Sequence, residues 1–126
     1  MSDTTIDGEA LEETLQKHER WIEREEEGER ADFSLAELRG ADLSGRRLPG
    51  ARLYRADLKG ANLSKSDLRL CNFVEADLSW ADLSGSDLRG CDFTDADLRD
   101  ANLKGAAMKG AILEGADYEG ARYSVK

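Results

Sequence analysis

The sequence has little of what most enzyme and membrane sites are built from. Among its 126 residues are one histidine, two cysteines and one proline, and only 6% are aromatic. No apolar run approaches the ~18 residues that cross a bilayer. The first residues include acids where a signal peptide needs basic ones. We therefore expect a cytoplasmic protein with no membrane segment.

The formal net charge of -9 is unevenly distributed. Residues 1–30 carry eleven acidic side chains against four basic ones. The rest of the chain carries 16 acids and 14 bases, so it is nearly neutral. The acidity therefore belongs to the N-terminal segment, and it is weak evidence that the remaining surface imitates a nucleic acid.

What the sequence does have is a five-residue repeat that runs from Ala31 to Val125. Every fifth residue is large and apolar. Ala, Ser or Cys stands two positions before it, with Arg46 as the exception, and Asp or Asn usually stands directly before it. The nineteen centres are Phe33, Leu38, Leu43, Leu48, Leu53, Leu58, Leu63, Leu68, Phe73, Leu78, Leu83, Leu88, Phe93, Leu98, Leu103, Met108, Leu113, Tyr118 and Tyr123.

A period of five fits neither a helix nor a strand, so neither element would keep all the centres inside. A chain that turns every five residues would do so, and four such sides close a coil of 20 residues. Residue types support this coil, because Phe33, Phe73 and Phe93 share one phase modulo 20. We predict an all-β solenoid, a quadrilateral β-helix of just under five 20-residue coils stacked about 4.8 Å apart.

Residues 1–30 are expected to form an N-terminal cap, which divides the chain into a capping segment (1–30) and a repeat domain (31–126). A helix from Asp7 would carry an apolar stripe and end near Gly28. The stripe is too narrow to form a core alone, so we expect it to lie on the first coil, with His18 packing or hydrogen bonding beside Trp21. Its residues are Leu11, Leu15, His18 and Ile22.

Arg46 occupies an inward position. Of two explanations, a backbone bulge that turns its side chain outward and a buried ion site, we favour the bulge. Pro49 suits a corner, where no backbone donor is needed. Cys71 and Cys91 replace Ala in the small position, and His18 is too distant to join them in a metal site. We expect no catalytic residue, metal or cofactor.

The A-(D/N)-L-x-x array resembles the pentapeptide-repeat family, and the resemblance covers Ala31 to Val125. It implies a right-handed quadrilateral β-helix. The stretch from His18 to Ile22 and from Gly28 to Phe33 also looks like an N-terminal cap of bacterial members. Some members bind and protect DNA gyrase by imitating duplex DNA, and those dimerise at the C-terminal end. Most members have no assigned activity.

Several outward positions are apolar, which departs from the polar rule of such repeats. We interpret them as a face that contacts a protein partner, although the N-terminal helix would cover part of it, at Leu35 and Tyr54. One side of the coil and its corner hold Leu35, Tyr54, Leu70, Val74 and Ile112, and Trp80 stands at a different corner.

Two further features bear on partners. One outward column is acidic, namely Glu37, Asp57, Asp77, Asp97 and Asp117, and it is the face that a mimic of DNA would use. We favour a structural role for it, because Asp and Asn bond to nearby backbone and basic residues flank the column.

At the C-terminal end, Tyr118 and Tyr123 would plug the last coil or join two copies as a homodimer.

The sequence thus predicts a non-enzymatic bacterial scaffold that presents a flat face to an unidentified protein. The alternative is a binder or protector of DNA gyrase, a type II topoisomerase, that imitates DNA. Direct binding to nucleic acid is not expected. A designed or consensus-derived repeat protein stays open as well.

Overall fold

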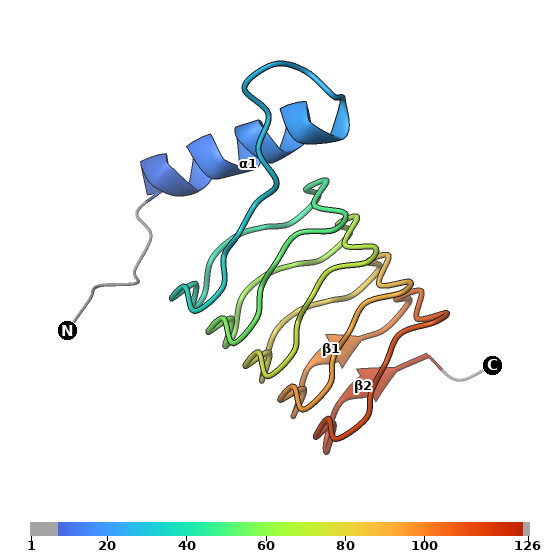
Figure 1. The fold of residues 1–126 in the computed structure, drawn as a ribbon. Coiled ribbons are helices and arrows are strands. Elements are labelled where there is room, and N and C mark those ends of the chain that lie inside the picture. The colour runs from blue at the N-terminus through green and yellow to red at the C-terminus, as the bar shows by residue number, and fades with distance from the viewer. Residues whose placement is uncertain (1–7, 125–126) are drawn as a thin grey trace.

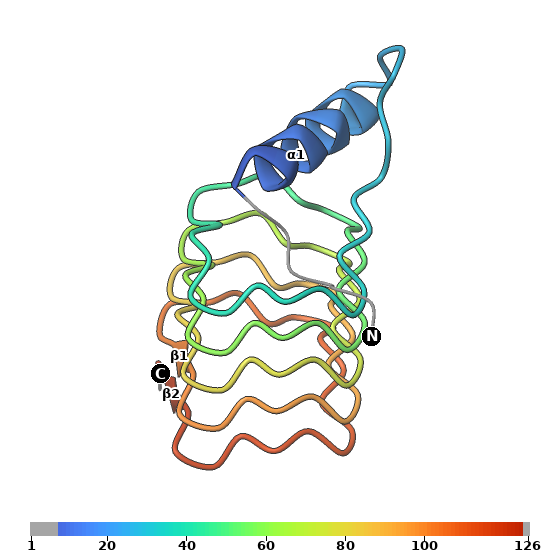
Figure 2. The same ribbon diagram turned by 90° about the vertical axis from the view of Figure 1, so that its left-hand side faces the viewer.

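The computed structural model describes residues 8–124 and shows a β-solenoid (Figure 1). One helix, α1 (Gly8–Ile22), lies across the N-terminal end of the stacked coils (Figure 2). Two short strands, β1 (Asn102–Leu103) and β2 (Arg122–Tyr123), pair in parallel near the other end. The N-terminal helix and the solenoid share a core, because Leu15 is buried in the same cluster as the repeat centres.

Parallel pairing links residues that are 20 apart in the sequence, from Asp32 with Arg52 to Asp97 with Asp117. The coil therefore has the length that the distribution of Phe predicts. Most pairings within residues 8–124 are single-residue bridges, and β1 and β2 are only two residues long. Strands stay short because each five-residue side spends two residues on a turn.

The corners are four-residue turns, as where the Ala36 amide donates to the Phe33 carbonyl at 3.0 Å. The third residue of each turn has positive φ, which glycine adopts without strain. Larger residues also occupy this position, among them Leu70 at 61° and Trp80 at 62°. In an L-residue this conformation costs about 1–2 kcal/mol.

Four faces result, and each is named here by a residue type in its columns. The Phe face has the centres Phe33, Leu53, Phe73, Phe93 and Leu113. The Ala face has Leu38, Leu58, Leu78, Leu98 and Tyr118. The Ser face has Leu43, Leu63, Leu83, Leu103 and Tyr123. The Arg face has Leu48, Leu68, Leu88 and Met108.

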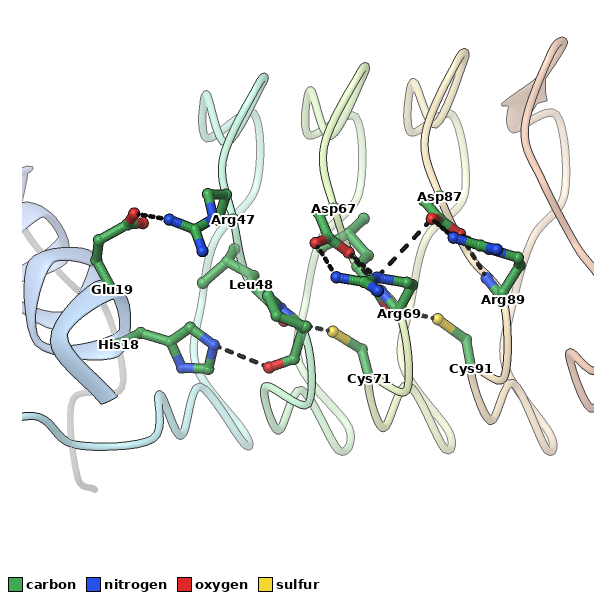
Figure 3. Close-up of polar contacts among 12 residues, drawn as sticks. His18, Glu19, Arg47, Leu48, Asp67, Arg69, Cys71, Asp87, Arg89 and Cys91 are labelled. Carbon is green, nitrogen blue, oxygen red and sulfur yellow. Dashed lines mark hydrogen bonds and ion pairs between the residues drawn. The ribbon is translucent and has the colours of Figure 1, made fainter. Parts of the chain in front are cut away.

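The interior is filled by the centres and the small residues, both buried through most of the rod. Where the small residue carries a hydroxyl or thiol, it donates to a carbonyl in the preceding coil. Ser66 Oγ bonds to the Leu43 carbonyl at 2.8 Å, and Cys71 Sγ to the Leu48 carbonyl at 2.9 Å (Figure 3). Burial raises the pKa of the Cys71 thiol, so it remains a protonated donor.

The end of α1 differs from the prediction. We expected Gly28 to terminate the helix, but α1 ends at Ile22 and Arg24 takes the left-handed conformation with φ 58°. The Arg24 amide donates to the Trp21 carbonyl and the Glu25 amide to the Arg20 carbonyl, at 3.2 and 2.9 Å. This is a Schellman motif formed without glycine. Asp7, where we predict the helix to begin, lies outside the described residues.

Candidate interaction surfaces

His18 joins α1 to both ends of the first coil. The Ala31 amide donates to its Nδ1 at 2.8 Å, and Nε2 lies 2.9 Å from the Pro49 carbonyl (Figure 3). Because Nδ1 accepts, Nε2 carries the proton and donates to Pro49. The side chain is buried, and its ring centroid lies 5.1 Å from that of Trp21. The predicted role of His18 beside Trp21 is confirmed. Burial lowers its pKa below the ordinary value.

Two arginines of the Arg face, Arg46 and Arg47, form ion pairs with glutamates of α1 and the residue that follows it. Both terminal nitrogens of Arg46 reach the Glu12 carboxylate, at 3.2 and 2.6 Å. Arg47 bonds to Glu19 and, at 3.0 Å, to Glu23. The bulge that we expected at Arg46 is wrong, since its carbonyl still accepts from the Asp67 amide in the regular ladder. Its side chain turns toward the helix because α1 supplies a carboxylate there.

The outward apolar residues of the Phe face lie in more than one column. Leu35, Tyr54 and Val74 occupy neighbouring coils along one edge, with Leu35 53% exposed and the other two half-buried. Ile112 belongs to another column, where it pairs with Asp92. We expected α1 to cover part of this face, but α1 lies over the end of the coils (Figure 1), and Leu35 stays exposed.

A different apolar strip runs along the corner between the Arg and Phe faces. This corner strip consists of Trp21, Pro49, Gly50, Leu70 and Gly90. The Trp21 ring covers Gly50, where a Cβ would lie 3.6 Å from the ring. Leu70 is 69% exposed and its side chain lies over Gly90, where a Cβ would come within 2.7 Å of it. Beside the strip is a hollow of about 430 Å³, lined by Trp21, Ile22, Arg24, Pro49, Gly50 and Leu70.

The acidic column is largely engaged in local bonds. Arg99 donates two bonds to Asp97, at 2.9 and 2.7 Å, and lies 3.9 Å from Asp117. Asp57 pairs with Arg39, and Asp77 accepts from the amide and hydroxyl of Ser79. Arg99 lowers the pKa of Asp97 by direct hydrogen bonding. Arginine therefore compensates the charge of part of the column, at Asp57 and Asp97, and the column is not a row of wholly uncompensated anions.

The Arg face repeats this arrangement. Arg69 makes two bonds to Asp67, and Arg89 makes two to Asp87 (Figure 3). Arg69 also lies 3.9 Å from Asp87 in the next coil. Sequence reasoning missed this ladder of ion pairs, although the recurring Asp-Leu-Arg triplet signals it.

Within residues 8–124, the last coil leaves an open hollow at the end of the solenoid opposite α1. A hollow of about 480 Å³ is lined by Leu98, Leu103, Ala106, Met108, Leu113, Tyr118, Tyr123 and Ser124. Tyr118 and Tyr123 are 52% and 59% exposed. The expectation that these rings plug the last coil is therefore wrong, because they line the rim and leave the interior accessible.

Within residues 8–124, no group of three or more His, Cys, Asp or Glu side chains could hold a metal ion. The same residues contain no helix with the length and apolar character to cross a bilayer.

The family model for pentapeptide repeats matches residues 36–74 and 76–115, in eight copies, which is more than half of the chain. The chain belongs to the pentapeptide-repeat family. None of the curated protein sequences compared with it matches. Proteins of this family are generally non-enzymatic structural or interaction proteins.

Solved structures of pentapeptide-repeat proteins resemble this one. Rfr23 from the cyanobacterium Cyanothece 51142 is 30% identical with a TM-score of 0.72, over 74% of this chain and 64% of its own. A thylakoid-lumen protein of Arabidopsis thaliana is 34% identical with a TM-score of 0.34, over 72% and 57%. This chain thus spans less than two thirds of either relative. QnrB1, a plasmid-mediated fluoroquinolone resistance protein, is 24% identical with a TM-score of 0.26, over 68% and 59%.

Trp80 stands apart from the other exposed apolar residues of this pentapeptide-repeat protein. It is 65% exposed at the corner between the Ala and Ser faces. The same column holds Gly40, Gly60, Asp100 and Gly120, so Trp80 takes a positive-φ position that glycine fills in three of the other four coils.

Proposed function

We propose that this pentapeptide-repeat protein is a non-enzymatic scaffold that binds a protein partner along the corner strip and the adjoining Phe face. The proposal rests on the position of Leu70, a leucine in a column of glycines. Its column otherwise holds Gly50, Gly90 and Gly110, all with positive φ. A leucine there adds backbone strain and exposes a large apolar side chain, two costs that burial by a partner would offset.

The surroundings of Leu70 suit a binding site for an apolar side chain of the partner. Trp21 and Pro49 form the walls of the hollow beside it, and Arg24 lies at its edge. Aromatic residues and arginine are the usual anchors of protein interfaces. A flat rod with such a corner would accept an extended or helical segment along its length.

Leu70→Gly tests the proposal because it separates binding from stability. The change removes the side chain but relieves the positive φ, so the folded protein should become more stable. Recovery of the partner from a lysate of the source organism should fall at least about tenfold. The matched control is Lys65→Gly, which relieves φ 55° at the corner between the Ser and Arg faces and should leave recovery unchanged. Equal recovery with Leu70→Gly would refute the corner strip.

DNA gyrase is the second candidate partner. The acidic column supports it, since coils at about 4.8 Å spacing line up Glu37, Asp57, Asp77, Asp97 and Asp117. The bonds from Arg39 and Arg99 weaken that field. We expect no inhibition of gyrase supercoiling at tens of micromolar protein, with or without a quinolone. Inhibition that Asp77→Lys abolishes would favour gyrase instead.

We also propose a homodimer formed through the C-terminal hollow. The exposed rings of Tyr118 and Tyr123 and the apolar interior behind them support this contact. Light scattering over the micromolar range tests the homodimer, with Tyr118→Asp as the variant that should remain monomeric.

We also propose that the protein is cytoplasmic, and imaging of the tagged full chain tests this location.

A further inference from the structure

We propose that His18 is an acid-sensitive latch: its neutral imidazole holds α1 on the first coil, and a proton on Nδ1 releases α1 from the end of the solenoid. The inference does not depend on which partner the protein binds. It rests on the position of one titratable side chain at the junction of the helix, the start of the first coil and its end.

While α1 lies on the first coil, both ring nitrogens of His18 are hydrogen-bonded. Nδ1 accepts the Ala31 amide at 2.8 Å, and Nε2 donates to the Pro49 carbonyl at 2.9 Å. A protonated imidazole has two donors and no acceptor. Its new N–H would point at the Ala31 N–H, so that bond is lost and a buried charge is left unpaired. Because the ring is buried, the proton enters only when α1 has opened.

The charged groups around the ring do not remove this penalty. Arg30, on the connection to the first coil, lies close enough to oppose a second positive charge. Glu19, on α1, favours the charged form, but it is already bonded to Arg47. Arg46 faces α1 as well and is paired with Glu12. Desolvation is the largest influence on the ring and keeps it neutral.

Release would uncover the interior of the first coil. Leu15 is buried against the repeat core, with Leu11 partly buried beside it. Without α1, the first centres, Phe33, Leu38, Leu43 and Leu48, would lose that cover at the end of the rod. Such an end exposes apolar surface and a strand edge to which another chain can add.

Hydrogen exchange of the full chain between pH 7.5 and 4.5 measures how often α1 opens from the first coil. After correction for intrinsic exchange, we expect the open fraction reported by the α1 and Ala31 amides to rise about tenfold per pH unit below about pH 6.5. The amides of Leu63 and Leu83, in the middle of the solenoid, should stay protected. NMR should show a neutral Nε2–H ring that titrates below the ordinary value.

His18→Gln and His18→Asn are the matched variants, because neither side chain titrates. In both, the open fraction should not change with pH, whatever its level. A wild-type open fraction that stays flat relative to Leu63 and Leu83 would overturn the latch. So would the same acid-dependent opening in His18→Gln, because carboxylates would then be responsible. A ring that titrates at or above 6.5 in the folded protein would also overturn it.

Discussion

The rings of Phe73 and Phe93 lie parallel, with centroids 5.0 Å apart and planes 4° from each other. Twenty residues separate them in the sequence, so the stack is a direct result of the coil length. Leu53 and Leu113 continue the same column on either side. The coils are therefore held in register by side chains of similar shape as well as by backbone bonds.

We expect Phe93→Ala to cost about 3–5 kcal/mol of the free energy of unfolding, because it leaves a cavity in a closed interior. Phe93→Leu should cost less, since leucine already occupies this column. The double variant Phe73→Leu/Phe93→Leu should cost about 0.5–1.5 kcal/mol less than the sum of the single changes, since both remove one ring contact. Urea denaturation measures all of these, and strict additivity would contradict the stacking.

Cys71 should tolerate serine but not valine. A serine at this position can donate to the Leu48 carbonyl, as Ser66 does to the Leu43 carbonyl. Cys71→Val removes the donor and overfills the site, so we expect a loss of about 1–3 kcal/mol. Thermal denaturation compares the two variants. A Cys71→Ser protein no more stable than Cys71→Val would contradict the role of the hydrogen bond.

Gly28→Ala should loosen the cap although Gly28 does not end the helix. A Cβ there would lie 2.5 Å from the Trp21 amide nitrogen and 2.7 Å from the Arg20 carbonyl carbon, both backbone atoms that cannot move aside. We expect a loss of about 1–3 kcal/mol, seen as faster hydrogen exchange in α1. Gly8→Ala, where nothing lies within 4 Å, is the control and should be neutral or stabilising.

Acid should weaken the ion-pair ladder of the Arg face. Hydrogen bonds from Arg89 lower the pKa of Asp87 below its ordinary 3.8. A lowered pKa in the folded state means that the stabilisation is present above about pH 4 and disappears as the pH falls through the folded value. Asp87→Asn should therefore reduce stability at pH 7 and make little difference near pH 2.

The size of the Asp87 effect should fall with added salt, because the pair is largely exposed. Asp42→Asn is the control for the salt effect, since Asp42 bonds to Ser44 instead of an arginine and Asn62 fills the same column. The Ser44 hydrogen bonds also lower the pKa of Asp42, so its effect should depend on pH but less on salt. Denaturation midpoints at both pH values and two salt concentrations test this prediction. An effect of Asp87→Asn on stability that does not change with pH would contradict a stabilising ion pair.

The sequence predicts the coil well because each pentapeptide repeats one local rule. Asp or Asn before the centre accepts the amide two residues on, as Asp77 does from Ser79, so local and long-range preferences agree. The family model and Rfr23 confirm the repeat and the solenoid class. The handedness that the family resemblance implies stays a prediction.

The cap is less predictable because it depends on contacts between distant residues. The bonds of His18 need the start and the end of the first coil to meet beneath α1, which no local pattern encodes. The sequence does not show which role Gly28 has, because a helix end and a close backbone approach both require glycine. Leu70 and Gly90 are recognised as partners only once the 20-residue register is known.

In residues 8–124, α1 covers one end of the coils (Figure 1) and the last coil leaves a hollow at the other, and this polarity has a consequence for the proposed homodimer. Two copies that join by their open ends each turn a sealed end outward. In the part of the chain that the structure describes, both outer ends of such a pair are covered by α1, which leaves no coil end there for a third copy to extend. While α1 stays in place, association through the hollow would therefore end in a closed pair, and fibres would require its displacement.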